Sequence, residues 1–595
     1  MANASSLDDV NPRPVRFAIP GIQVCSFGKT THDSELCAIR MLTPPTGSAP
    51  HLALLLVLGI APCWAQVEPP RTSDSPPGEF IPPDAELESS GAVIGEILID
   101  NQNIFNPAYA GEDVPVFRLA NRLHIKTKAS VVQHQLLFQS GDRYSRRVLD
   151  ETERILRAER YFYDAWIKPV RYHDGKVDLR VTTRDVWTLN PGFDFGRSGG
   201  KNTTGVDLEE LNLLGTGAAI ALTHKAGIDR DETRLGISDE HAFGSWTGVD
   251  ATYADNSDGY RRQLVVNRPF YSLNTRYAGG FTGTDDLRVD SLYDRGQIVD
   301  QFRDRSRFVE GYAGWSSRLD NGWVRRWNVG ATYDERLFAP TPTWTGLTVL
   351  PEGRKFIYPW VRFDLIQDDY LKMRNRDQIG RTEDFYLGLT TSVRLGWADS
   401  ALGSSRSGLQ FQTSAGYAAL ASERSTLLLS AAYTGRVENG DLHNAVLNAA
   451  IRFYAEQSSH WLFFTTLVGA AGHRLDLENQ LLLGGTNGLR GYPLRYQGGD
   501  ARGLLTIEQR YFSDWYPFRL FRVGGAAFFD AGRTWGSAPL ATPSLGLLKD
   551  VGFGLRIGNS RSGLGNVIHV DLAFPLDGDS SIKRVQFLVQ TEESF

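Results

Sequence analysis

Cysteine is nearly absent from this chain of 595 residues: its three cysteines, Cys25, Cys37 and Cys63, all precede residue 66. Everything that follows is free of thiols, which excludes thiolate metal sites, cysteine nucleophiles and disulfides from that part of the chain. An excess of one charge is missing too, because 63 Lys and Arg face 69 Asp and Glu without forming a basic block. This balance argues against a nucleic-acid partner, which needs a concentrated positive surface.

The sequence also has no apolar run of about 20 residues, the length that a membrane-spanning helix needs. A shorter apolar run covers residues 51–60, and Ala61-Pro-Cys-Trp-Ala65 follows it. This pattern is typical of a secretory signal peptide, so we assign residues 1–65 to a prefix and signal peptide, with cleavage after Ala65. Two alternatives remain for this segment. Translation from Met41 would leave no Lys or Arg before the run, and lipid attachment at Cys63 is disfavoured by Pro62.

Two segments follow the signal peptide. Residues 66–90 are rich in proline, serine and acidic residues, which predicts a linker because such a segment buries too little apolar surface to order itself. Residues 91–186 predict a small α+β module with the order strand, helix, helix, strand, strand. Its elements are a strand over 93–100, a helix over 131–138 capped by Ser130, a helix after Ser145, and two strands joined by the turn Asp174-Gly175. The second helix has one apolar face, formed by Val148, Leu149, Thr152, Ile155 and Leu156.

The order of these elements resembles a polypeptide-transport-associated (POTRA) domain. The run 132–137, Ser140-Gly141-Asp142 with Tyr144, Tyr161-Phe162 and the closing strand 177–181 all fit that pattern. The resemblance implies a periplasmic domain that receives a nascent chain by strand addition at a sheet edge. A generic α+β domain with no partner has the same secondary structure. One departure from the family pattern is the insertion over residues 101–128, which is longer than such a domain requires.

From Thr188 to Phe595, 408 residues show the alternation of β-strands separated by Gly, Asn and Asp turns. In one example Trp327, Val329, Ala331 and Tyr333 alternate with Asn328, Gly330, Thr332 and Asp334. A soluble sandwich alternates too, but this segment is far longer, and aromatic residues recur near its strand ends as in an interfacial girdle. At roughly 25 residues per strand and loop, we predict a mainly β fold with a transmembrane antiparallel barrel of about 16 strands over residues 187–595.

Motifs near the C-terminus resemble the outer-membrane assembly factor superfamily, the BamA/TamA and bacterial surface antigen group. Leu489-Arg490-Gly491-Tyr492 matches the family's loop motif, and Phe528-Phe-Asp530-Ala-Gly532 matches its motif on a following strand. The resemblance implies that Arg490 lies at the tip of a loop folded into the barrel and that Asp530 is its partner on the wall. Glu508 is a possible additional partner, and Phe595 is the terminal residue of the assembly signal. In a simpler alternative, Arg490 is one of many solvated lumen arginines.

The family mechanism also has a physical basis in this sequence. A closed barrel must satisfy every backbone group at its seam, so a weakly paired seam could open sideways and template an incoming strand. The seam lies between a first strand over residues 189–197 and a last strand over 583–595. Pro191 and Gly192 weaken pairing there, although Pro191 could simply mark the start of the strand.

Enzymatic motifs are missing: we find no Gly-x-Ser-x-Gly elbow, no His-Glu-x-x-His and no P-loop. We therefore expect no enzyme activity, no cofactor and no metal. The expected function is insertion or translocation of unfolded outer-membrane or secreted polypeptides at the outer membrane of a Gram-negative bacterium, with the POTRA-like module in the periplasm and the lipid bilayer as a further partner. The alternatives are a two-partner secretion transporter for one exported protein, and a passive porin, structural or lipid-handling barrel.

Overall fold

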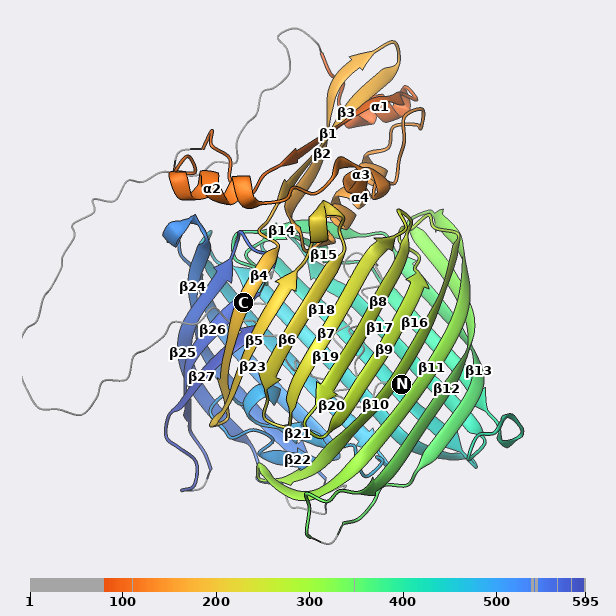
Figure 1. Cartoon of the computed structure of the whole chain (residues 1–595), viewed down its shortest axis with the longest axis vertical. Coiled ribbons are helices and arrows are strands. Elements are labelled where there is room, and N and C mark those ends of the chain that lie inside the picture. Colours follow the sequence, from red (N-terminus) through yellow and green to blue (C-terminus); the bar gives the residue numbers. More distant parts are fainter. Residues whose placement is uncertain are drawn as a thin grey trace, which may run out of the picture.

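The computed structural model describes residues 80–109, 111–346, 348–536, 540, 544–563, 566–578 and 580–592. The predicted signal peptide, its cleavage site and Phe595 lie outside the described residues. A small α/β module stands on one end of a barrel (Figure 1).

The module contains a three-stranded sheet in the order β1-β3-β2 among the described residues. Strand β1 runs parallel to β3, and β2 runs antiparallel to it. The strands are β1 (Val93–Gln102), β2 (Phe162–His173) and β3 (Lys176–Asp185). The helices are α1 (Asp84–Ser89), α2 (Pro115–Leu123), α3 (Ala129–His134) and α4 (Arg146–Ala158).

The apolar face expected for the second helix forms the module core. Leu149 and Leu156 of α4 are fully buried, and they pack in one cluster with Val177, Leu179 and Val181 of β3. The hairpin turn is confirmed, since Asp174 and Gly175 both have positive φ, at 48° and 72°. Their conformation is the one that an Asp-Gly turn supplies at low cost.

Three details differ from the predictions. Residues 84–89, which their composition placed in the linker, form α1 because Leu87 enters the module core. Helix α3 begins at Ala129, so Ser130 lies inside the helix and is not its cap. The segment 101–128, expected only as an insertion, contains the helix α2.

In the described part of the chain, twenty antiparallel strands close the barrel, so the predicted number of about 16 is wrong. The error came from the assumed loop length. Two residues join β4 to β5, β8 to β9, β10 to β11 and β18 to β19, and most strands with their loops use less sequence than expected. Their bounds are β4 (Leu189–Ser198), β5 (Lys201–Glu210), β6 (Ala219–Ala226), β7 (Asp231–Ala242), β8 (Thr247–Asn256), β9 (Gly259–Arg268), β10 (Tyr277–Asp294), β11 (Gln297–Asp320), β12 (Trp323–Pro340), β13 (Arg354–Gln367), β16 (Thr390–Ala398), β17 (Gly408–Ala421), β18 (Ser425–Glu438), β19 (Asp441–Glu456), β20 (Trp461–His473), β23 (Ala501–Phe512), β24 (Phe521–Trp535), β25 (Leu548–Asn559), β26 (Val567–Pro575) and β27 (Gln586–Glu592).

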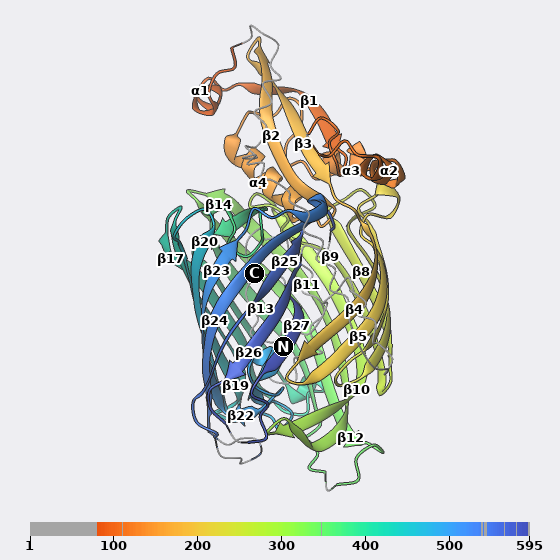
Figure 2. The same cartoon turned by 90° about the vertical axis from the view of Figure 1, so that its left-hand side faces the viewer.

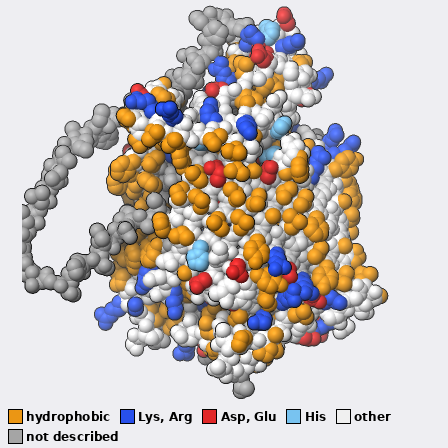
Figure 3. Space-filling view, viewed as in Figure 1, with side chains coloured by type: hydrophobic (Ala, Val, Ile, Leu, Met, Phe, Trp, Pro, Cys, Tyr) orange, Lys and Arg blue, Asp and Glu red, His pale blue; other side chains and the backbone are white. Residues whose placement is uncertain are grey.

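The barrel wall is apolar outside and polar inside. On β12, Trp327 and Val329 are exposed on the outer surface, whereas the intervening Asn328 is buried in the interior. Figure 3 shows hydrophobic side chains spread over the outer wall. This is the inverse of a soluble protein and matches a wall that faces lipid. Among the described helices, none is long and apolar enough to cross a membrane.

Charge on the outer wall should therefore be costly. Leu447, in the middle of β19, is exposed on the outer face. We expect Leu447→Arg to destabilise the barrel by about 2–4 kcal/mol, because the guanidinium would lie in hydrocarbon. Equilibrium unfolding from lipid vesicles measures this change. The adjacent Asn448→Lys, on the interior face, should cost much less, and equal costs for both variants would contradict the assignment of the faces.

Candidate functional site: a plugged lumen and a weak seam

The loop between β20 and β23, residues 474–500, folds back into the barrel. It contains a two-stranded hairpin of β21 (Leu481–Leu483) and β22 (Gln497–Gly499). Leu489 and Tyr492 from its tip are fully buried and share one hydrophobic cluster with Leu548 and Ile582. The Tyr492 hydroxyl donates to the carbonyl oxygen of Lys549 at 2.7 Å. The tip is therefore held by apolar packing as well as by polar contacts.

The structure brings Arg490 together with Asp530 and Glu508. Arg490 Nε and Nη2 donate to the two carboxylate oxygens of Asp530 at 2.7 Å and 3.0 Å. Its Nη1 donates to Glu508 Oε1 at 2.9 Å. The guanidinium carbon also lies 3.4 Å from the centre of the Phe528 ring. Bidentate charge-assisted bonds and a cation–π contact together fix both the position and the orientation of the guanidinium.

The glycines of both motifs are required by close approach. A Cβ at Gly491 would lie 2.7 Å from Asp550 Cβ, and the Gly491 N–H donates to the Asp550 carboxylate at 3.0 Å. A Cβ at Gly532 would lie 2.7 Å from a methyl carbon of Leu483. Each glycine thus lets loop backbone or side chains lie directly against the wall.

Sequence reasoning missed two further carboxylates of this site, Asp550 and Asp571. Asp571 Oδ2 lies 3.9 Å from Arg490 Nη1, and the same carboxylate pairs with the buried Arg556. With Glu508 and Asp530, these residues place one carboxylate on each of four consecutive strands, β23 to β26. An acidic residue at an inward position of successive strands is the signal that could have identified them.

A second plug closes the lumen at the module end. The connection between β13 and β16 contains a hairpin of β14 (Tyr370–Arg374) and β15 (Thr382–Tyr386), which we call the mouth hairpin. Met373, Ile379 and Phe385 of this segment pack with inward side chains of the wall, including Tyr454 and Phe464. Sequence reasoning missed this element. Its signal is a connection of more than 20 residues where barrel strands are usually joined by short turns.

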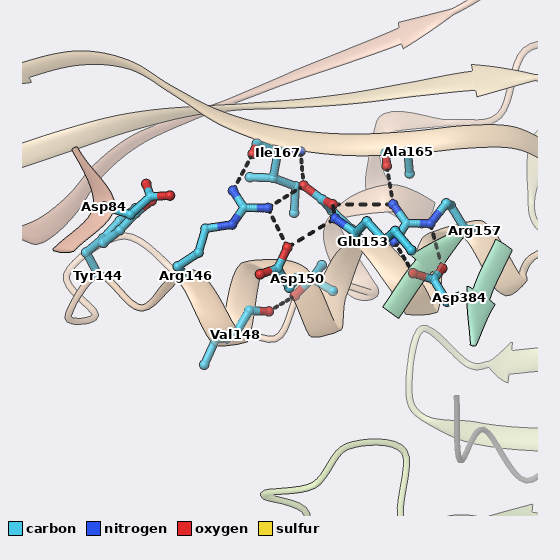
Figure 4. A network of polar contacts seen from close by, with 12 residues as sticks. Asp84, Tyr144, Arg146, Val148, Asp150, Glu153, Arg157, Ala165, Ile167 and Asp384 are labelled. Carbon is cyan, nitrogen blue, oxygen red and sulfur yellow. Dashed lines mark hydrogen bonds and ion pairs between the residues drawn. The ribbon is translucent and has the colours of Figure 1, made fainter. Parts of the chain in front are cut away.

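The mouth hairpin is also bonded to the module (Figure 4). Arg157 of α4 donates to both carboxylate oxygens of Asp384, at 2.7 Å and 2.8 Å. Lys372 donates to Glu153 of α4 at 2.7 Å. Burial alone would raise the pKa of Glu153, but the bonds to Lys372, the Ile167 N–H and Arg146 outweigh it and lower the pKa. The module and the mouth hairpin therefore form one connected unit.

The rest of the lumen holds a polar cavity beside the first strands. It is lined by both acidic and basic side chains. Glu209 of β5, Arg234 of β7 and Asp250 of β8 are among them. Arg160, from the module, reaches this cavity, and its Nη2 lies 3.3 Å from Glu209 Oε2. The two plugs thus leave free space on the side of the barrel that follows β4.

The seam between β27 and β4 is weakly paired. Among the described residues its register is a single pair, Val589 opposite Arg197, whereas every residue of β4 has a partner on β5. Figure 2 faces the side of the barrel where β27 and β4 adjoin. Pro191 has no N–H to donate, and Gly192 makes room for the buried Asp207 carboxylate, which a Cβ would approach to 2.4 Å. Pro191, the third residue of β4, therefore has no backbone donor to offer a neighbouring strand.

At its module end, β4 is held by another element. Trp187 N–H donates to the carbonyl oxygen of Arg561 at 2.7 Å, and the Gly563 N–H donates to the Trp187 carbonyl oxygen at 3.1 Å. These residues belong to the connection between β25 and β26. The base of β4 is therefore fixed, while most of its edge facing β27 has no described ladder partner there.

No protein-family model and no curated protein matches this chain. Among solved structures, it is similar to BamA from Haemophilus ducreyi lacking POTRA domains 1–3, with 12% identity, a TM-score of 0.36 and coverage of 83% of this chain and 84% of that one. It is also similar to CdiB from Escherichia coli, with 13% identity, a TM-score of 0.43 and coverage of 84% and 77%. For CdiB from Acinetobacter baumannii the values are 12%, 0.41, 84% and 73%.

Removing the cation of the loop tip should release the loop. We expect Arg490→Ala to cost about 3–5 kcal/mol, because Glu508 and Asp530 would be left buried without their shared partner. Protease sensitivity of residues 474–500 and the unfolding midpoint of the barrel measure the effect. Arg474→Ala is the matched control in the same loop, since Arg474 pairs with the exposed Asp441. If both variants behave alike, Arg490 does not anchor the loop.

The contact between module and mouth hairpin should weaken in acid. A carboxylate whose pKa is lowered on folding contributes stability above its ordinary value of 4.5, and loses it as pH falls through the lowered value. We therefore expect faster amide exchange in residues 370–386 as pH falls below about 4.5, after correction for intrinsic rates. Glu153→Gln should show the faster exchange already at neutral pH. Amide exchange in the mouth hairpin that does not change with pH would contradict this assignment.

Proposed function

We propose that this protein assists the insertion or translocation of polypeptides at the outer membrane of a Gram-negative bacterium. In this proposal the barrel spans the membrane, the module lies in the periplasm as a POTRA-like client-binding domain, and clients enter along the seam. The motifs around Arg490 and Asp530, which resemble those of outer-membrane assembly factors, support the same assignment.

The single observation that carries the proposal is the seam. In lipid each unpaired backbone group costs several kcal/mol, so a barrel without a further role should pair its first and last strands along their length. Here β4 and β27 share one register pair among the described residues. The edge of β4 is thus available to template a client strand, as edge strands do elsewhere.

The module supplies a second edge near the barrel mouth. In the described sheet β2 lies at the edge and pairs with β3 alone. Its first residues are close to the mouth hairpin, because Arg381 donates to the Phe162 carbonyl oxygen at 3.0 Å. A client strand added to β2 would therefore be delivered beside the barrel opening.

The filled lumen favours this proposal over a passive porin. The loop tip at Arg490 and the mouth hairpin occupy the lumen from opposite ends, and both are anchored by buried ion pairs. A pore for free diffusion gains nothing from two anchored plugs. A two-partner secretion transporter would use the same seam and lumen, and differs from the proposal in having one client.

Locking the seam should abolish the activity. Arg197 and Val589 are direct partners, so Arg197→Cys with Val589→Cys places two thiols within disulfide reach. In a chain whose natural cysteines are replaced by serine, we expect oxidation to block client insertion into vesicles and reductant to restore it. The reason is that a covalent bond prevents the two strands from separating.

The matched control is Ile568→Cys with Thr591→Cys, a direct pair between β26 and β27 that lies off the seam. Its oxidation should leave client insertion unchanged. Full insertion activity with the Arg197 and Val589 disulfide in place would refute a role for seam opening.

A further inference from the structure

Helix α2 is an unusual element of the module, because it displays its apolar residues to the outside. Val116, Leu119 and Leu123 are each more than half exposed, and so is the following Ile125. Positions 116, 119 and 123 recur at the spacing that places side chains on one helix face. Exposed apolar residues scattered singly need no explanation, but a stripe on one helix indicates a contact surface.

The opposite face of α2 is fixed to the protein. Phe117 stacks on Phe105, with ring centres 4.0 Å apart. Asn121 donates to the Phe105 carbonyl oxygen at 2.7 Å and accepts from the Phe105 N–H at 3.1 Å. The exposed stripe is therefore held in a constant orientation by the module and is not a consequence of a loose helix.

The segment around α2 is bonded to the turns at the module end of the barrel wall. Lys128 N–H donates to the Gly215 carbonyl oxygen at 3.0 Å, in the turn between β5 and β6. A Cβ at Gly111 would lie 2.8 Å from Nη2 of Arg519, a residue of the turn between β23 and β24. These two turns expose apolar side chains of their own: Leu213, Leu214, Trp515 and Phe518. Helix α2 thus lies at the level where the apolar wall ends.

Basic side chains accompany the apolar stripe. Arg118, Arg122, Lys126 and Lys128 are all exposed, and Arg118 pairs with the exposed Asp113. Figure 3 shows basic and hydrophobic side chains together over α2, next to the apolar wall of the barrel. A helix with an apolar face and flanking cations is the form that lies in the interface of a bilayer.

We propose that α2 is an interfacial helix that binds the periplasmic leaflet of the outer membrane, with its apolar stripe among the acyl chains and its cations at anionic phospholipid headgroups. Continuity with the lipid-facing wall and the complementary charge both identify a bilayer as the occupant. The two turns that flank α2 connect to strands on either side of the seam, β5 and β24. The helix therefore places a lipid contact beside the seam. The inference uses the membrane placement of the proposed function but not its polypeptide client.

The test measures the depth of single labels in the full chain. An environment-sensitive fluorophore is attached at Leu119→Cys, with Cys25, Cys37 and Cys63 replaced by serine, and the protein is reconstituted into phosphatidylethanolamine and phosphatidylglycerol vesicles containing a lipid-attached quencher. We expect a blue-shifted emission and a loss of fluorescence, as for a label at Leu222→Cys on the outer wall of β6. A label at Asp174→Cys, in the distant hairpin turn, should be unaffected by the quencher.

The outcomes separate this inference from the proposed function. Quenching at position 222 without quenching at 119 would overturn the lipid contact of α2 and leave the barrel in the membrane. Absence of quenching at 222 would refute the membrane placement itself. Shielding of the label at 119 only when an unfolded polypeptide is added would make the stripe a polypeptide site and also overturn the inference.

The charge contribution is tested by lipid composition. Replacing phosphatidylglycerol with phosphatidylcholine should reduce the quenching at 119, because the attraction of the cations is lost. The triple variant Arg118→Gln, Arg122→Gln and Lys126→Gln should remove this dependence on lipid charge. If the chain that keeps Arg118, Arg122 and Lys126 shows the same quenching in both lipids, the anionic headgroups have no part in the contact.

Discussion

Closure of the sheet is the constraint on which the other features depend. In hydrocarbon a backbone N–H or C=O group has no water to bond, so a sheet can cross a membrane only if it forms a barrel with every edge paired. Nineteen of the twenty junctions in the described barrel have ladders of seven or more register pairs, some with a bulge, whereas the junction of β27 and β4 has a single register pair. Backbone bonding therefore singles out this junction as the least paired place in the described wall.

The size of the barrel has its own consequence for the interior. Barrel diameter grows with strand number, and twenty strands enclose more space than the inward side chains can fill. The chain fills much of it from both ends, with the loop tip at Arg490 and with the mouth hairpin. Each plug combines an apolar cluster with an ion pair: Arg490 of the loop tip binds Asp530 of the wall, and Asp384 of the mouth hairpin binds Arg157 of α4. The mouth hairpin is further bonded to α4, which gives the module a physical connection to the lumen.

The sequence predicted the features that depend on local pattern. Period-two alternation predicted strands, the length of the segment and its recurring aromatic residues favoured a barrel over a sandwich, and Asp174-Gly175 predicted a turn. The pair of Arg490 with Asp530, 40 residues apart, came from a resemblance to known motifs, because no local pattern encodes it. The strand number was wrong because two-residue turns such as Gly199-Gly200 make most repeats of strand and loop shorter than assumed. Helix α1 depends on one residue, Leu87, which packs into a core formed by strands that lie far along the sequence.

Other parts of the site leave only an indirect signal in the sequence, because they form when separate segments meet in the fold. Asp550 and Asp571 are ordinary inward residues until the loop over residues 474–500 folds into the lumen and places Gly491 and Arg490 beside them. The mouth hairpin has a strand-like sequence, and its position in the lumen depends on packing against wall residues such as Tyr454 and Phe464 and on its bonds to α4. The orientation of α2 depends on Phe105, which precedes it by a loop. Each of these features is a tertiary contact between different elements or between an element and a loop.

The central claim is that the edge of β4 receives a polypeptide strand. Site-specific photocrosslinking in intact cells tests it most directly, with one probe at Phe195 on β4, a second at Trp166 on β2, and a control probe at Leu429 on β18. The account predicts that nascent outer-membrane or secreted polypeptides are trapped at the first two positions and not at the third. A correctly inserted barrel that traps no polypeptide at Phe195 would contradict it.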